Sequence, residues 1–146
     1  MIEINEIWLA EFCGLFWGEG CADIQRYSRN GHQLYRPRLR MQLRSDDEQM
    51  LREIQEVFGG TMNFVPNTSQ RNNSAWQWTL QEKSKIVWVC DNVLLKGRLS
   101  AKKKKQIEYV REAAALRAGK LGHTTEGEKT RLYELYEIVR KLKRFE

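Results

Sequence analysis

The sequence predicts an α+β fold in which helices cover one face of a four-stranded antiparallel sheet. Apolar residues recur every three to four positions over residues 4–17 and 47–58, which is typical of helices with a buried stripe. Apolar and polar residues instead alternate over residues 34–44 and 75–81, which is typical of strands with one buried face. Each helix is followed by a predicted pair of strands, and a sheet with helices on one face satisfies this order.

The first half of the chain predicts a helix, a hairpin and a second helix. These elements are a helix over about 4–17, strands over 21–29 and 34–44, and a helix over about 47–58. Gly18 and Gly20 end the first helix. The Asn30-Gly31 pair favours a tight hairpin turn, because both residues tolerate positive φ. Ser45 or Asp46 is expected to cap the second helix.

The second half predicts another hairpin and then only helices. These elements are strands over 61–66 and 75–81, a helix over about 83–95, and a helix from Ser100 to about 117. The polar segment 67–74 is expected to be the hairpin loop. Thr125 and Glu128 have the spacing of a capping box for a last helix. We therefore expect a core over residues 1–118, with a linker and a helix over 119–146 packed on it. The apolar residues expected under the helices are Leu39, Met41, Leu43, Trp76 and Trp78, and Trp88 is also expected in the core.

The charge pattern indicates an anionic partner. The chain of 146 residues suits one domain, and its 41% apolar content can supply a core. Lys and Arg number 25 against 19 Asp and Glu, for a net charge of +6, and nucleic acid is the usual partner of such chains. Six arginines and no acidic residue lie between Ile24 and Ser45. The alternative is a solvated strand face whose arginines pair with acids from elsewhere in the chain.

An arginine-bearing two-stranded ribbon fits the major groove of double-stranded DNA, where arginine can bind phosphates and guanine edges. Strand alternation places one set of side chains on the polar face of the sheet. The expected DNA-binding residues are Asp23, Gln25, Tyr27, Arg29, Arg36, Arg38, Arg40, Gln42, Arg44, Asn63, Gln77 and Thr79.

Cysteine usage and the termini bear on the compartment. Three cysteines without a CxxC pair disfavour a structural zinc site and favour a reduced, intracellular setting. An organelle and a bacterial or archaeal cytoplasm all stay open. The N-terminus has no basic segment typical of a signal peptide. No apolar run approaches membrane-spanning length, so we expect no membrane partner.

Residues 12–20, FCGLFWGEG, carry the most specific information in the chain. Gly14 and Gly18 lie four residues apart and therefore share one helical face, where another backbone can approach closely. Glu19 follows at the point where the helix ends and a strand begins. A carboxylate at such a junction is well placed to hold a metal ion.

This segment resembles the LAGLIDADG motif of homing endonucleases. Trp17 replaces the first aspartate of the motif, and the residues that match it are Gly14, Leu15, Phe16, Gly18, Glu19 and Gly20. The element order over about 4–117 is also similar to the family core. The resemblance implies an αββαββα arrangement with a saddle-shaped antiparallel sheet along the DNA major groove, here extended by C-terminal helices. Because we find one motif only, it implies a homodimer formed through the motif helices. The dimer-interface residues are then Phe12, Cys13, Gly14, Phe16 and Trp17.

The resemblance also implies a reaction. A homing endonuclease hydrolyses both strands of a long, roughly palindromic DNA target, one strand per subunit, and leaves short 3′ overhangs. Glu19 and the backbone carbonyl of Gly18 would bind Mg²⁺, a site that Mn²⁺ or Ca²⁺ can also occupy. Lys103 would lie near the scissile phosphate, with Lys102 as the alternative. The candidates for orienting the attacking water are Gln42, Arg44 and Ser45. An intron-encoded origin fits the family, and an intein origin stays open.

Three other functions remain open at this point. One is an RNA-splicing maturase on the same scaffold, which would bind group I intron RNA through basic residues of the last helix: Arg131, Arg140, Lys141, Lys143 and Arg144. Another is a DNA-binding regulator that has lost cleavage, although the retained Glu19 argues against that loss. The last is a basic binding module of unrelated fold.

Overall fold

The computed structural model describes residues 3–66 and 74–144, with the side chain of Arg144 outside this description. The predicted loop over 67–74 therefore lies outside the described residues except for Ser74. The helices are α1 (Glu6–Glu19), α2 (Glu48–Phe58), α3 (Lys83–Val89), α4 (Ala101–Arg117) and α5 (Glu126–Arg144). The strands are β1 (Gly20–Arg29), β2 (His32–Arg44), β3 (Thr61–Val65) and β4 (Ala75–Leu80). The predicted α+β class and the order of the elements are confirmed.

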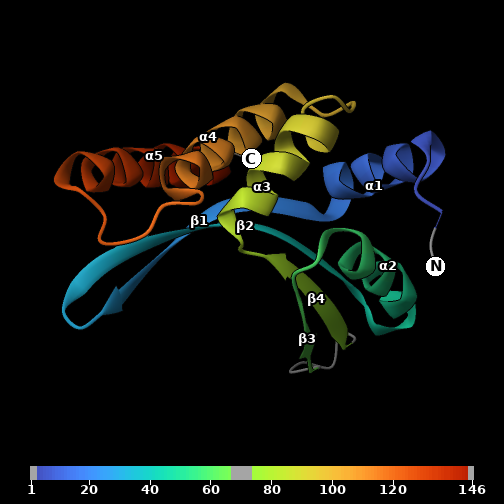
Figure 1. Cartoon of the computed structure of the whole chain (residues 1–146). Coiled ribbons are helices and arrows are strands. Elements are labelled where there is room, and N and C mark those ends of the chain that lie inside the picture. The colour runs from blue at the N-terminus through green and yellow to red at the C-terminus, as the bar shows by residue number, and fades with distance from the viewer. Residues whose placement is uncertain (1–2, 67–73, 145–146) are drawn as a thin grey trace.

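The four strands form one antiparallel sheet in the order β1-β2-β4-β3. The sheet is curved like a saddle: the β1–β2 hairpin descends on one side and the β3–β4 pair on the other, with the helices above (Figure 1). Its underside is concave and carries no helix in the described residues. This arrangement leaves one face of the sheet open along its whole width.

The helix-covered face holds an aromatic core. Phe12 and Phe16 of α1 are fully buried and point toward the sheet, because residues four apart share one helical face. The Phe12 ring lies 4.8 Å from the Phe58 ring and 6.3 Å from the Trp78 ring. Cys13 is also buried. These contacts correct the prediction that Phe12, Cys13 and Phe16 form the dimer interface, since all three pack inside the protomer.

Local sequence signals account for the ends of most elements. Asn30 and Gly31 have φ values of 52° and 79°, which confirms the hairpin turn between β1 and β2. The Ser100 hydroxyl caps α4 and accepts the third backbone N–H of that helix. Thr125 and Glu128 exchange backbone-to-side-chain hydrogen bonds of 2.9 and 3.2 Å, which confirms the capping box.

Three local predictions are wrong. A 3₁₀ turn over Ser45–Asp47 precedes α2, and no side chain caps that helix. The helix predicted over 83–95 changes at Cys90 into a π-helical turn, Cys90–Leu94 (η2), in which the Leu95 N–H bonds to the Cys90 carbonyl. Trp88, expected in the core, is 56% exposed because it lies on the outer side of α3.

The last helix packs against α4 and the edge strand β1. Arg131 forms a two-pronged ion pair with Glu112 of α4, with distances of 2.6 and 2.9 Å. Leu135 is fully buried, and the Tyr136 ring lies 5.5 Å from that of Tyr35. The boundary at residue 118 stays a prediction. Within the described part of the chain, no helix combines the length and apolar character needed to cross a membrane.

Candidate active site and nucleic-acid interface

The motif places an exposed carboxylate at a tight junction. Glu19 is the last residue of α1, and Gly20 begins β1 while its N–H still bonds to the Phe16 carbonyl. A methyl group on Gly20 would lie 2.4 Å from the Phe16 ring, so only glycine allows this passage from helix to strand. The Glu19 carboxylate is exposed and makes no hydrogen bond or ion pair with the described residues. It is therefore open to solvent or a ligand.

The start of α4 brings a lysine to the same junction. The Lys103 ammonium donates a 2.6 Å hydrogen bond to the Gly20 carbonyl and lies 5.8 Å from the centre of the Phe16 ring. The Lys102 ammonium is instead buried, with no hydrogen-bond partner in the described part of the chain. The structure therefore brings Lys103, rather than Lys102, next to the motif. The catalytic role of Lys103 stays a prediction.

A hollow of about 530 Å³ opens in front of Glu19. Its lining comes from the end of the motif, from the start of α4 and from the end of α5: Trp17, Gly18, Glu19, Gly20, Cys21, Ser100, Lys103 and Lys143. Sequence reasoning considered Lys143 only for RNA binding. Its position beside Glu19 depends on how α5 packs across β1, and no local pattern announces that packing.

The strand register gathers the predicted DNA-binding residues on the concave face. Asp23 pairs with Arg38 and Gln25 with Arg36, so these side chains share one face. The same face continues across β4 and β3 through Gln77 and Asn63, which pair with each other. The residues that remain at least partly exposed are Gln25, Tyr27, Arg29, Arg36, Arg38, Arg40, Gln42, Arg44, Asn63 and Gln77. Asp23 and Thr79 lie on this face but are 6% exposed, which corrects the prediction that they meet DNA directly.

Asp23 is buried because it pairs with three cations. Arg38 donates to both of its carboxylate oxygens at 2.9 Å through Nε and Nη2. Arg40 donates through Nη2, and the Lys143 ammonium lies 3.3 Å away. Burial raises the pKa of the Asp23 carboxyl, but the Arg38 hydrogen bonds and the charges of Lys143 and Arg40 outweigh burial and hold it below its usual value. An acid just outside the arginine-rich segment therefore neutralises part of it.

This pKa shift predicts a dependence of folding stability on pH. A carboxyl with a lowered pKa in the folded state stabilises the fold above its unfolded pKa, about 3.9 for Asp, and that contribution disappears as the pH falls through the folded pKa. Glu112 and Glu128 also have lowered pKa values, so all three contribute. We expect urea unfolding from pH 5 down to pH 2 to show a smaller loss of stability in Asp23→Asn than in the native chain. Equal slopes would contradict the ion-pair assignment.

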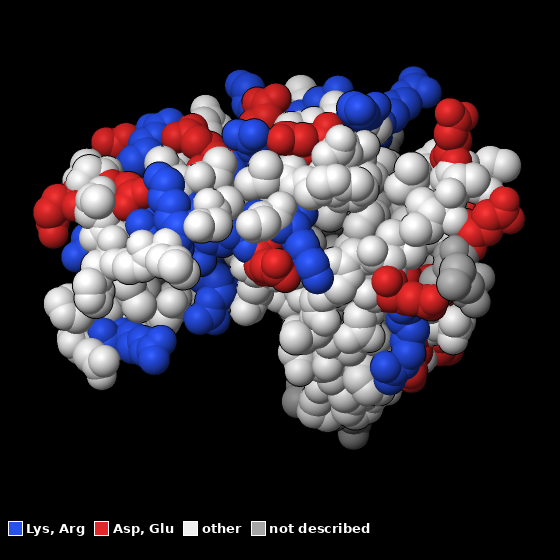
Figure 2. All heavy atoms as spheres, in the orientation of Figure 1, with Lys and Arg blue, Asp and Glu red and all other residues white. Residues whose placement is uncertain are grey.

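The other two arginines on the concave face of β2, Arg36 and Arg44, differ in how firmly they are held. Arg36 lies over the Tyr27 ring, 4.4 Å from its centre, while Arg44 forms only a loose, exposed 3.8 Å pair with Asp46. In Figure 2, Lys and Arg gather on the β1–β2 side of the hollow beneath the sheet, and the β3–β4 side is largely uncharged. Positive charge therefore concentrates where the two long strands run, next to the motif.

The register also ranks the residues proposed to orient water. Met41 pairs with Gly20, so Gln42 follows directly beside the junction and is exposed on the concave side. Arg44 lies two residues further along β2. The Ser45 hydroxyl already accepts a 3.0 Å hydrogen bond from Ser74. Gln42 is thus the best placed of the three, and its role stays a prediction.

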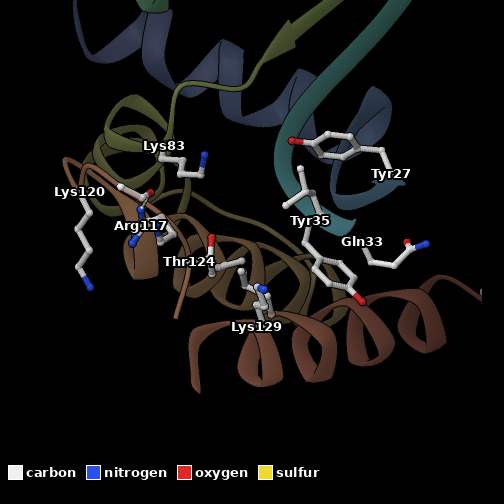
Figure 3. Close-up of a pocket in the computed structure, with 12 residues that line it drawn as sticks. Tyr27, Gln33, Tyr35, Lys83, Arg117, Lys120, Thr124 and Lys129 are labelled. Atoms are coloured by element: carbon white, nitrogen blue, oxygen red, sulfur yellow. Dashed lines mark hydrogen bonds between the residues drawn. The ribbon is translucent and has the colours of Figure 1, made fainter. Parts of the chain in front are cut away.

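A second, basic hollow of about 230 Å³ lies at the other end of the hairpin. Figure 3 shows Lys83, Arg117 and Lys120 on one side of it and Tyr27 and Gln33 on the other. Arg117 and Lys120 both pair with the Glu128 carboxylate, which reduces the net positive charge of this hollow. It lies about seven residues along β1 from Gly20, roughly 20 Å at strand spacing, and is therefore separate from the motif.

The residues near the motif offer few oxygen donors for a metal ion. The described residues contain no group of three or more His, Cys, Asp or Glu side chains that could hold a metal ion. Near the motif they offer the Glu19 carboxylate and the backbone carbonyl of Gly18, both on exposed residues. Oxygen donors suit a hard cation such as Mg²⁺, which commonly takes one or two carboxylates and completes its shell with waters and substrate phosphates. These oxygen donors fit Mg²⁺ by their chemistry, with waters and phosphate oxygens as the remaining ligands.

Sequence comparison decides the family. The sequence model described as "LAGLIDADG endonuclease" matches residues 12–114, which span the motif, all four strands and most of α4. The chain belongs to the LAGLIDADG endonuclease family. No curated protein matches the chain.

Solved LAGLIDADG structures share the fold at low sequence identity. The homing endonuclease I-CvuI, in complex with its target in the presence of 2 mM Ca, is 18% identical over 93% of this chain and 82% of its own, with a TM-score of 0.70. The homing endonuclease I-TnaI is 16% identical over 98% and 96%, with a TM-score of 0.68. The group I intron-encoded I-CeuI, complexed with DNA, is 13% identical over 97% and 70%, with a TM-score of 0.73. These matches confirm the LAGLIDADG fold of the sheet and helices.

Proposed function

We propose that this LAGLIDADG protein is a homodimeric, site-specific DNA endonuclease that requires a divalent metal ion. One observation carries the proposal: Glu19 stands exposed at the helix–strand junction, beside Lys103 and at the end of the arginine-bearing concave face. The same hollow thus offers a metal-binding carboxylate and a cation, next to a surface suited to a phosphate backbone. Related structures were solved with DNA and with Ca or Mg, which supports DNA as the partner and a divalent cation as the metal ion in this proposal.

Each residue at the junction has a distinct task in this proposal. The Glu19 carboxylate and the Gly18 carbonyl would hold Mg²⁺, which when bound lowers the pKa of water and stabilises negative charge on phosphate oxygens. Lys103, held in place by the Gly20 carbonyl, faces the scissile phosphate and balances the charge that develops on it. Gln42 orients the attacking water from the neighbouring strand. The arginines of β2 bind the duplex through its major groove.

A second copy of the chain is the proposed occupant of the outer face of α1. A methyl group on Gly14 or Gly18 would meet nothing within 4 Å in the protomer. Ile7 and Trp17 on the same helix are 70% and 44% exposed. Helices that lack side chains at two positions four residues apart can approach closely, and two such faces suit a symmetric dimer. This contact would bring the two Glu19 residues to one axis.

Replacing Gly14 with Leu is expected to weaken self-association at least tenfold and to leave the protomer folded. The added side chain has open space in the protomer but would separate two helices in close contact. Sedimentation equilibrium measures the dimer dissociation constant, and circular dichroism reports the fold. Gly127→Leu in α5, where the space is equally open, is the matched control. A dimer of unchanged strength in Gly14→Leu would place the contact elsewhere.

The maturase alternative loses much of its proposed surface. Arg131 pairs with Glu112 and Glu134, and Arg140 pairs with Glu137. Lys143 pairs with Asp23, whose side chain lies on the concave face of the sheet. The side chain of Arg144 lies outside the described residues. A helix whose cations are largely neutralised by neighbouring acids has a weaker attraction for RNA phosphates. No observation in the structure favours the inactive regulator over the enzyme.

Cleavage of the DNA around the protein's own gene tests the proposal. The substrate is a duplex in which the two sequences that flank the gene are joined directly, without the gene between them. We expect the purified chain with Mg²⁺ to cut both strands of this duplex and to leave staggered ends. We expect EDTA to stop the reaction. End mapping on both strands identifies the site. Binding to the host intron RNA without any DNA cut would instead favour the maturase. Selective DNA binding without cleavage in Mg²⁺ or Mn²⁺ would favour the regulator.

A further inference from the structure

We propose that Asp23 is a positioning residue that presets Arg38 for reading guanine, holds Arg40 beside it, and ties both arginines to the C-terminal helix through Lys143. This inference rests on the proposed function, because it concerns how the concave face selects DNA. It assigns Asp23 a role in specificity although the buried carboxylate has no access to the bases.

Arg38 is held in one orientation, and its outer edge makes no hydrogen bond with the residues that the structure describes. Its Nε–H and one Nη2–H donate to the two Asp23 oxygens, both at 2.9 Å. A guanidinium carries five N–H donors, so two on Nη1 and one on Nη2 remain. One from each nitrogen forms the planar pair that matches the N7 and O6 acceptors of guanine. Because the side-on ion pair fixes the guanidinium plane, less rotamer freedom is lost when that pair binds a base.

Arg40 shares the same carboxylate from the next position on that face. Its Nη2 donates to the Asp23 oxygen that also receives Arg38 Nη2, and the Arg40 side chain is 28% exposed. Two arginines separated by one residue on the same strand would repel each other without this shared acid. Asp23 therefore reduces the repulsion between Arg38 and Arg40, while the cluster of one acid and two arginines keeps a net positive charge toward DNA.

Lys143 links this cluster to the candidate active site. Its ammonium lies 3.3 Å from Asp23 Oδ2, across 120 residues of sequence, and its side chain lines the hollow in front of Glu19. The end of α5 is thereby anchored between the base-reading arginines and the reaction centre.

Base selectivity of Asp23→Asn tests the inference. Arg38→Ala and Arg40→Ala, profiled on a library of single-base variants of the target, identify the base pairs that each arginine reads. We expect Asp23→Asn to lose about tenfold selectivity at those base pairs and to keep it elsewhere. Because the variant gains one net positive charge, we expect its affinity for random DNA to rise. A uniform loss of affinity at all positions would indicate a structural role only and would overturn the proposal.

Matched controls separate positioning from charge. Asp46→Asn removes an acid beside Arg44 on the same surface but without a close ion pair, so it should raise affinity for random DNA and leave selectivity unchanged. Lys143→Gln should increase hydrogen exchange in the last turn of α5, whereas Lys141→Gln, an exposed position on the same turn, should not. Equal exchange in these two variants would refute the link to α5.

The result also distinguishes this inference from the proposed function. If the native chain binds no DNA selectively, the proposed function fails, and the inference fails with it. If the native chain is selective and Asp23→Asn has the same base profile, only the inference fails.

Discussion

Replacing Glu19 with Gln is expected to reduce DNA cleavage by at least about 100-fold while DNA binding is retained. Glutamine keeps the size of the side chain but removes the charge that would hold a divalent cation. The fold should tolerate the change, because Glu19 is exposed and makes no ion pair or hydrogen bond with the described residues. Single-turnover cleavage at saturating protein measures the rate, and gel-shift titration measures binding.

Glu108→Gln is the matched control for this variant. Glu108 lies on α4, away from the proposed dimer face, is also exposed and has no ion pair in the described part of the chain. We expect its cleavage rate to equal that of the native protein. If Glu19→Gln cleaves at the native rate, Glu19 is not the metal ligand. If both variants lose cleavage equally, the effect reflects the net charge of the protein rather than a particular site.

Replacing Phe12 with Ala is expected to lower the free energy of unfolding by about 3–5 kcal/mol. Phe12 is fully buried between the Phe58 and Trp78 rings, so truncation leaves a cavity where α1, α2 and the sheet meet. A loss of this size is a large part of the stability of a single domain. Urea denaturation at several protein concentrations measures the change and separates it from any effect of dimer dissociation.

Trp17→Ala distinguishes the core of the protomer from its outer face. Trp17 is 44% exposed, so its truncation should cost the protomer little and should act mainly on self-association. The two aromatic residues of one motif are thus expected to differ in effect: Phe12→Ala destabilises the fold, and Trp17→Ala weakens the dimer. If Phe12→Ala left the unfolding free energy unchanged and dissociated the dimer, the original assignment of Phe12 to the interface would be restored.

The sheet was predictable because its patterns are local. Alternation over 34–44 and the Asn30-Gly31 turn are enough to place Arg36, Arg38 and Arg40 on one face, and the register in the structure confirms that placement. The helix N-termini at Ser100 and Thr125 were equally accessible, because capping depends on residues within three positions.

The faces of the motif helix were not predictable from periodicity. Residues 12–17 are apolar around most of the helix, so no pattern shows which side meets the core and which meets a partner. The choice depends on Phe58 and Trp78, which arrive from other elements. Spatial neighbours also decide the fate of Asp23. Strand alternation placed it toward DNA, and only the cations opposite it and at the end of α5 show that its carboxylate is already used.

The position of the bound metal ion shows directly whether Glu19 is its ligand. Crystals of the protein with its DNA target, grown with Mn²⁺ in place of Mg²⁺, would show each ion by its anomalous scattering. We expect a peak about 2 Å from a Glu19 carboxylate oxygen, which is coordination distance, and next to a backbone phosphate of the DNA. We expect Glu19 of each protomer to take part in metal binding. A clear Mn²⁺ peak on other residues, with Glu19 outside its coordination shell, would show that Glu19 is not the metal ligand.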